Sequence, residues 1–264
     1  MELSPTTYWA LRRLGAAVML LAGAPAAFAG APRLGVDGTE FVVAMPDGRK
    51  LRSADLVGAT LKLEAGGRPV EIVIESVEED RHAVGGRVVL HSLLVKEQGG
   101  RSIPICRGDA QGRNLGFPVP DGRGGFDLTC TSGAIGKCIR WGYRPWDERP
   151  GGAPLAALHR ACVHMARADY GGDGQAHTRN GTLIDMQDGY GIQRFETQVP
   201  MAFEAAWGFD GAVCIARPRI ADLVTLTQLA EHYPKLHDGL GPQACSEEQA
   251  LRQPAALLFN RSFR

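Results

Sequence analysis

A chain of 264 residues is long enough to bury one large hydrophobic core or two smaller ones. Its 29 basic residues balance 29 acidic ones, and this zero net charge favours neither a nucleic-acid partner nor a disordered, highly charged chain. The composition includes 34 Gly and 16 Pro, which favours many turns and short strands over long helices.

The first 29 residues have the features of an export signal. Two arginines precede an apolar run over residues 14–23, and Ala27-Phe28-Ala29 has the small-x-small pattern of a signal peptidase site. The run is too short for a comfortable membrane span. We expect cleavage after Ala29, which leaves a mature chain without a membrane span in an extracytoplasmic location, periplasmic or secreted. Retention of residues 1–29 as an N-terminal anchor is the alternative.

All the cysteines follow the predicted signal. They are Cys106, Cys130, Cys138, Cys162, Cys214 and Cys245. An even number in an oxidising compartment predicts disulfides, but the sequence alone does not decide the pairing. Cys162 is expected in a bridge because it lies on a helix face that must be buried, and Cys138 is its preferred partner. The competing pairing joins Cys130 to Cys138.

Alternation of apolar and polar residues predicts β structure between residues 34 and 106. Gly66 and Gly67 separate two of these runs as a hairpin turn would. This part of the chain contains no candidate catalytic cluster, so we expect a small antiparallel sheet or barrel. The strands are expected at residues 41–45, 61–64, 70–75, 88–95 and 103–106.

The middle of the chain changes character twice. Residues 107–125 are rich in Gly, Asp and Pro and predict a long loop, either a linker or an ordered cover over the core. A strand is expected at residues 126–130. Ile135, Cys138 and Ile139 then fall at helical spacing, and the helix that they predict ends before Pro145.

The strongest helical pattern covers residues 155–170. Leu158, Cys162 and Met165 line one face of it, and Gly171-Gly172 is the expected C-cap. Four further elements are predicted after this helix. They are a hairpin around Asp210-Gly211, a helix over residues 220–232, a short helix after the capping box of residues 246–249, and a closing strand at residues 255–259.

Several separate motifs in this half of the chain resemble the bacterial ADYC-domain family. They are residues 133–138 (GAIGKC), 140–146 (RWGYRPW), 159–162 (HRAC), 167–170 (RADY), 172–174 (GDG), 177–179 (HTR), 181–182 (GT), 203–207 (FEAAW) and 210–214 (DGAVC). The number of matches makes the resemblance fairly specific. It covers roughly residues 105–220 and implies an exported bacterial protein, but it names no reaction.

One position departs from the family motif. The motif that names the family ends in Cys, whereas this chain has Gly171 after Ala168-Asp169-Tyr170. If the family Cys is normally bridged, its partner in this chain must pair elsewhere or stay free. If that Cys were a catalytic thiol, this chain would lack the activity.

A catalytic site is predicted in the loop that follows the 155–170 helix. His177 is the candidate general base, oriented by Asp173 or Asp185, because a carboxylate fixes the tautomer of an imidazole. The alternative interpretation is structural: Asp173 organises the turn and His177 hydrogen-bonds the loop backbone.

The same loop raises two metal alternatives, and neither is favoured. Asp169, Asp173, Asp185 and Asp188 offer oxygen ligands for calcium, but their spacing does not match an EF-hand. Zinc ligands would come from two cysteines, 138 and 162, and three histidines, 159, 164 and 177; their spacing is not that of usual zinc motifs. We therefore expect no metal and no cofactor.

These observations predict an α+β protein. A β-rich N-terminal half, residues 30–125, is followed by a disulfide-stapled α+β core, residues 126–264. Two functions stay open: a non-catalytic exported binding or envelope-associated domain, and an extracytoplasmic enzyme of hydrolase type that uses His177 with Asp173 or Asp185. No nucleic-acid partner is expected, and the sequence names no ligand or partner.

Overall fold

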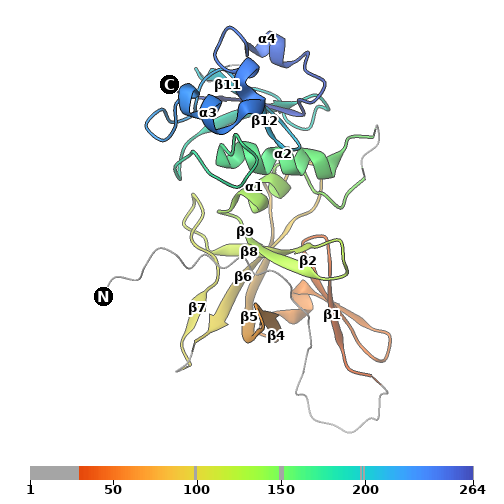
Figure 1. Ribbon diagram of the computed structural model, residues 1–264. Coiled ribbons are helices and arrows are strands. Elements are labelled where there is room, and N and C mark those ends of the chain that lie inside the picture. The colour runs from red at the N-terminus through yellow and green to blue at the C-terminus, as the bar shows by residue number, and fades with distance from the viewer. Residues whose placement is uncertain (1–29, 98–99, 149–151, 197, 199, 264) are drawn as a thin grey trace, which may run out of the picture. The chain divides into compact units, whose positions relative to one another are not determined.

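The computed structural model describes residues 30–263 except 98–99, 149–151, 197 and 199 (Figure 1). The predicted signal segment therefore lies outside the described residues. The contacts divide the chain into two compact units. The first unit runs to Arg81 and resumes at Arg87–Gly136, and the second contains His82–Gly86 and Lys137–Arg264.

The first unit is built from two antiparallel sheets. One sheet has the strand order β1-β2-β3, and the other has the order β4-β5-β6-β8-β9, with β7 also paired to β6. A 3-10 helix, η1 (Ser53–Leu56), follows β3. The strands are β1 (Arg33–Asp37), β2 (Glu40–Ala44), β3 (Lys50–Arg52), β4 (Thr60–Ala65), β5 (Arg68–Glu79), β6 (Val89–Lys96), β7 (Ser102–Pro104), β8 (Leu115–Pro120) and β9 (Phe126–Cys130).

The period-2 patterns of the first unit form strands as predicted. Leu61 and Leu63 of β4 and Ile72 and Ile74 of β5 are buried, and the two strands pair antiparallel across the Gly66-Gly67 turn. Both turn glycines have positive φ, which a residue with a Cβ rarely adopts. The buried side chains pack in one cluster with Phe41, and this cluster is the core of the first unit.

The prediction of a continuous loop over residues 107–125 was wrong. β8 lies inside this range, and its residues from Leu115 to Val119 are buried. It pairs with β9 from Gly116 to Pro120, but with β6 only at Leu115 and Gly116. Pro118 and Pro120 lie beyond that short pairing, so their missing N–H groups cost no ladder bond to β6. The Gly- and Pro-rich composition predicted a loop, whereas pairing with β9 stabilises a strand here.

The second unit combines helices with a four-stranded antiparallel sheet of order β10-β13-β11-β12. Figure 1 shows α2 lying along this unit's strands, and α2 contacts β11, β12 and β13. The α1 helix crosses the division between the two units. The elements are α1 (Ala134–Arg140), α2 (Leu155–Arg167), β10 (Ile184–Asp188), β11 (Ala202–Gly208), β12 (Gly211–Ile215), α3 (Leu226–His232), η2 (Pro234–Gly239), α4 (Glu247–Ala250) and β13 (Leu258–Ser262).

Two predicted helices have different ends from those expected. The α2 helix ends at Arg167 because Ala168 adopts a left-handed backbone, so Gly171-Gly172 is not its C-cap. The α3 helix begins at Leu226, six residues later than predicted. Its N-cap is Thr225, whose hydroxyl accepts the N–H of Gln228 and stabilises this start over an earlier one. The capping box predicted before α4 is confirmed.

The α+β class is confirmed, and all six cysteines are bridged. Cys138 pairs with Cys162, the preferred pairing, so the Cys130–Cys138 alternative is wrong. Cys106–Cys130 lies in the first unit and Cys214–Cys245 in the second. In the part of the chain that the structure describes, no helix is both long and apolar enough to cross a membrane.

Candidate functional site

The signature loop, residues 168–182, begins where α2 ends. Ala168 has a φ of 49°, and its N–H donates to the carbonyl oxygen of Met165 over 3.0 Å. The N–H of Asp169 donates to the carbonyl oxygen of His164 over 2.9 Å. These bonds satisfy carbonyl groups that the end of a helix would otherwise leave unpaired.

The Asp169 carboxylate organises the first turn of the signature loop. Its Oδ1 accepts the N–H of Gly172 at 2.9 Å, and its Oδ2 accepts the N–H of Gly174 at 3.0 Å. His164 Nδ1 lies 3.0 Å from the same Oδ2. Burial alone would raise the pKa of Asp169, but the hydrogen bonds from His164, Gly174 and Gly172 outweigh it and lower the pKa below its ordinary value. The carboxylate is therefore held in its ionised form.

His164 contacts Asp169 through Nδ1. In the sequence, His164 was a candidate only for a zinc site. Its Nε2 is buried and has no hydrogen-bond partner among the described residues. An imidazole oriented by a carboxylate is found in hydrolytic triads, where the second ring nitrogen contacts a hydroxyl or thiol nucleophile. No described side chain takes that place at Nε2, so the geometry supports a structural role for the pair. The one sequence feature that could have indicated this contact is the position of His164 five residues before Asp169, near the end of the predicted helix.

Tyr170 leads from the loop into a buried polar network. Its hydroxyl donates to Glu204 Oε1 at 3.2 Å and accepts the N–H of Arg219 at 2.7 Å. Arg219 and Glu204 form a two-point ion pair, with both N–O distances at 2.9 Å and both side chains buried. Burial, followed by the neighbouring Glu204 charge, raises the pKa of Tyr170 well above its ordinary value. The hydroxyl therefore remains a donor at any physiological pH.

Further contacts satisfy the rest of this network. Asn260 of β13 donates to Glu204 Oε2 at 2.9 Å and accepts the indole N–H of Trp207 at 2.7 Å. Arg219 Nη2 also donates to the carbonyl oxygen of Met165 at 2.7 Å. A buried ion pair is tolerated when its remaining donors and acceptors are also bonded. The network thus joins the end of α2 to β11 and β13.

Gly171, the position that departs from the family motif, lies against the ring of Tyr233. A Cβ added to Gly171 would come within 2.2 Å of that ring, so a cysteine here would require Tyr233 to move. The Tyr233 hydroxyl donates to Asp173 Oδ2 at 3.0 Å, and Lys235 Nζ donates to the carbonyl oxygen of Gly171 at 2.8 Å. Burial, followed by the hydrogen bond to Asp173, raises the pKa of Tyr233 to about 12. In this chain, a packed aromatic ring occupies the space of the motif Cys.

The three predicted catalytic residues have separate partners. His177 is buried, stacks on Tyr170 and places Nδ1 3.1 Å from the carbonyl oxygen of Ala168. Asp173 binds Tyr233 and the N–H of Gln175, and Asp185 accepts the N–H of Glu196. Among the described residues, no hydrogen bond or ion pair joins His177 to either carboxylate. The catalytic role of His177 with Asp173 or Asp185 therefore remains a prediction, and the described contacts do not join these side chains.

The aromatic and basic motif at residues 140–146 also makes internal contacts. The Tyr143 ring is buried, and its hydroxyl donates to Asp188 Oδ2 at 2.9 Å. The buried guanidinium of Arg144 donates to the carbonyl oxygens of Val84 and Gly85. Both side chains therefore stabilise the second unit.

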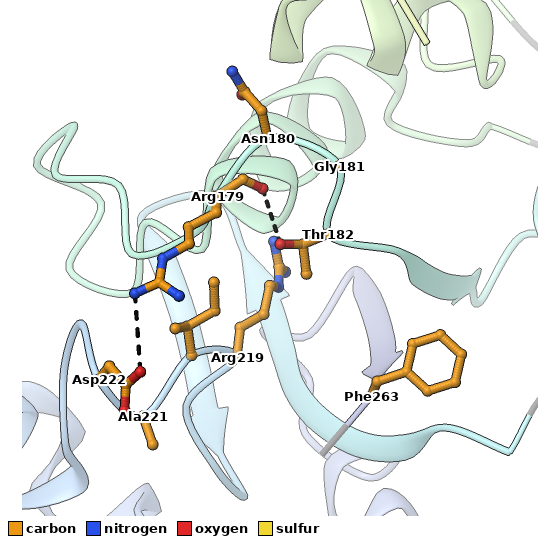
Figure 2. Close-up of a pocket in the computed structure, with 9 residues that line it drawn as sticks. Arg179, Asn180, Gly181, Thr182, Arg219, Ala221, Asp222 and Phe263 are labelled. Atoms are coloured by element: carbon orange, nitrogen blue, oxygen red, sulfur yellow. Dashed lines mark hydrogen bonds and ion pairs between the residues drawn. The ribbon is translucent and has the colours of Figure 1, made fainter.

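An open hollow of about 490 Å³ lies at the end of the signature loop. Figure 2 shows Arg179 and Asp222 on one side of it, Phe263 on the other and Arg219 between them. Three separate stretches of the second unit form its lining. They are residues 179–182, residues 219–222 and Phe263.

The charges around the hollow are unequally paired. The Arg219 guanidinium is buried and matched by Glu204. Arg179 is exposed, and its guanidinium has one charged partner among the described residues, Asp222, with Nη2 and Oδ2 3.9 Å apart. An exposed ion pair at this distance contributes about 0–1 kcal/mol. Arg179 is thus the cation at the hollow that is most available to a ligand.

The residues considered for metal binding are not grouped for it. Among the described residues, no set of three or more His, Cys, Asp or Glu side chains is placed to hold a metal ion. Cys138 and Cys162, considered as zinc ligands, are joined in a disulfide and supply no thiolate. The aspartates of the calcium alternative serve mainly as turn and loop caps, as Asp188 does for the N–H groups of Tyr190 and Gln193.

The fold and the site define an α+β protein with three disulfides, in which a capped helix end leads to an open hollow. The family model of the ADYC domain matches residues 53–221, which is more than half of the chain. The chain therefore belongs to the ADYC domain family. Neither the curated proteins nor the solved structures contain a match to it. The family match ends at Ala221, so Asp222 and Phe263 add to the hollow from outside the matched residues.

Proposed function

We propose that this ADYC-domain protein is an extracytoplasmic binding domain, periplasmic or secreted, and that its ligand occupies the hollow next to the signature loop. The observation that carries the proposal is the contrast between the signature residues and the hollow. Asp169, Tyr170 and His177 are buried and bonded within the second unit. Arg179, a few residues later, is exposed beside a concave surface.

Two further features support a binding role, and a third supports the location. The hollow of about 490 Å³ falls within the usual range for small-molecule sites, roughly 300–1,000 Å³. Its lining combines a charged group with apolar side chains, as ligand sites commonly do. The three disulfides suit an oxidising environment, which agrees with export by the predicted signal.

A ligand screen by thermal shift tests the proposal on the purified, oxidised protein. The screen should include small organic anions, cations and sugars. The Ala221→Trp variant places a large side chain in the hollow, and Ala156→Trp makes the same change at an exposed position of α2. We expect ligands that raise the melting temperature of the native protein and of Ala156→Trp, but not of Ala221→Trp.

The same material tests the alternative, an enzyme of hydrolase type that uses His177. Chromogenic ester and amide substrates are offered to the native protein and to His177→Gln. We expect no turnover above the buffer rate in either protein. Turnover that His177→Gln abolishes, or the absence of any ligand that depends on the hollow, would overturn the proposed function.

A further inference from the structure

The hollow presents an accessible cation on one side and a partly exposed aromatic ring on the other (Figure 2). The Arg179 side chain is 59% exposed and its partner Asp222 is 83% exposed. Phe263 is 45% exposed and lines the opposite side (Figure 2). Ile220 and Ala221 complete the apolar part of the lining. Charged and apolar recognition are therefore available in one site.

The hollow presents one accessible charge of each sign, and Arg179 is the group that can bind a ligand in a two-point geometry. Two guanidinium groups and one carboxylate line the hollow. Glu204, buried beneath it, neutralises Arg219, so the accessible charges are those of Arg179 and Asp222. A carboxylate can accept two parallel N–H bonds from a guanidinium, which are shorter and stronger than a single contact at 3.9 Å. A ligand carboxylate can thus displace Asp222 from Arg179.

The ring of Phe263 favours a ligand with an apolar body. Burial of exposed apolar surface contributes roughly 25 cal/mol per Å², and small inorganic anions cannot supply that contact. Resting on the proposed function, we infer that the ligand is an organic carboxylate with a ring-sized apolar body. Its carboxylate binds Arg179, its body packs on Phe263 and Ile220, and Asp222 is an internal competitor for Arg179.

A second surface of the same unit offers a matched control. Arg160 and Asp210 also form an ion pair at 3.9 Å, with side-chain exposures of 50% and 80%. The Arg160 guanidinium already stacks on Phe209, 4.2 Å from the ring centre. Neither residue of this pair lines the hollow. The two sites therefore share an Arg, an Asp and a similarly exposed Phe, but at the control site the guanidinium already stacks on the ring.

Calorimetric titration of the purified, oxidised protein with three probes tests the ligand class. The probes are 3-phenylpropionate, 3-phenylpropylamine and propionate. We expect 3-phenylpropionate to bind, the amine to show no binding, and propionate to bind at least about tenfold more weakly because it lacks the ring. Equal binding of the amine and the carboxylate would overturn the inference.

Three variants then assign the contacts. Arg179→Gln is expected to weaken 3-phenylpropionate binding about tenfold, the size of one lost charged hydrogen bond. Asp222→Asn removes the competitor and is expected to strengthen binding about two- to fivefold. Arg160→Gln should leave the affinity unchanged. Weaker binding by Asp222→Asn, or an equal loss with Arg160→Gln, would overturn the assignment to the hollow.

The two proposals can fail separately. Ligands that depend on the hollow but carry no carboxylate would sink the carboxylate inference and leave the binding function standing. If no compound of any charge responds to Ala221→Trp, the binding function itself fails. Unchanged melting temperatures of the unliganded Arg179→Gln and Asp222→Asn proteins would show that their altered affinities come from the site and not from the fold.

Discussion

The two units bury polar side chains in different ways. In the first unit, Ser53 and His91 are fully buried and 2.7 Å apart, and the Ser53 hydroxyl accepts the N–H of Phe41 at 2.8 Å. This centre is neutral when His91 is neutral. In the second unit, the buried polar centre is the ion pair of Arg219 and Glu204, and both of its side chains are buried. A neutral polar centre costs less to desolvate than an ionic one, which is stable only when its charges are fully paired.

The neutral and the ionic centre also differ in the elements of the fold that they connect. The neutral centre connects β2, η1 and β6, which are all parts of the first unit's scaffold. The ionic centre connects the end of α2 to β11 and to the segment that lines the hollow. We interpret the buried ion pair as an interaction that fixes the position of Arg219 and of the neighbouring residues that line the hollow. Variants of each centre test this interpretation.

Glu204→Gln should have the largest effect on the second unit. The substitution keeps the shape of the side chain but leaves the buried Arg219 charge without its carboxylate. Breaking one partner of a buried pair costs about 3–5 kcal/mol of the free energy of unfolding. Urea denaturation checks the value, and Glu204→Gln with Arg219→Met is the control that removes the orphan charge as well. A loss below about 1 kcal/mol would contradict an ionic centre.

The next largest effect on stability is expected from two disulfides, one in each unit, that close loops of equal length. Cys106–Cys130 and Cys138–Cys162 both have a sequence separation of 24. Loop entropy predicts that each contributes about 3.5 kcal/mol, because their closed loops are equal in length. Replacing either pair by alanines should lower the stability of its own unit by that amount, as measured by amide hydrogen exchange in β8 and in β11. Clearly unequal losses would show that native contacts, and not loop length, decide the contribution.

Acid should weaken the neutral centre. Burial lowers the pKa of His91 from 6.5 to about 4, against a smaller opposing effect of the Gly116 backbone. Between these values the unfolded chain binds a proton that the folded chain does not, so the free energy of unfolding falls as pH drops from 6.5 to 4. The stabilisation is fully present above pH 6.5, and its loss reaches about 3 kcal/mol near pH 4.

Urea unfolding at pH 7 and at pH 4, monitored by amide exchange in β6, measures this loss. His91→Gln removes the titrating group and is expected to flatten the pH dependence of the first unit, although it lowers stability at neutral pH. If the native protein and His91→Gln lose the same stability between the two pH values, His91 is not the acid-sensitive group.

Local patterns in the sequence predicted much of the fold but less of the site. The hairpin of β11 and β12 was predictable because its alternation and its Asp210-Gly211 turn are short-range features. The buried face of α2 predicted that Cys162 is bridged, and Cys138 was the preferred one of the possible partners. By contrast, β8 was read as part of a loop, since its support comes from pairing with β9. For His177 the sequence left two interpretations open, and the contact of its Nδ1 with the carbonyl oxygen of Ala168 agrees with the structural one. The sequence could not name that carbonyl group, because nearness in sequence does not fix which atoms meet.

The local periods, the turns, the capping boxes, the cysteine content and the family motifs can all be read from the amino-acid sequence. The positions of the buried charges depend on the tertiary fold. Glu204 meets Arg219 and Asn260 across 15 and 56 residues, and the hollow joins residues 179–182 to 219–222 and to Phe263. The physical reason is that strand and helix periods depend on neighbours in the chain, whereas a buried ion pair and a ligand site depend on how separate elements pack. Arg179 was one motif residue among many in the sequence, and the packing around it makes it the residue to test.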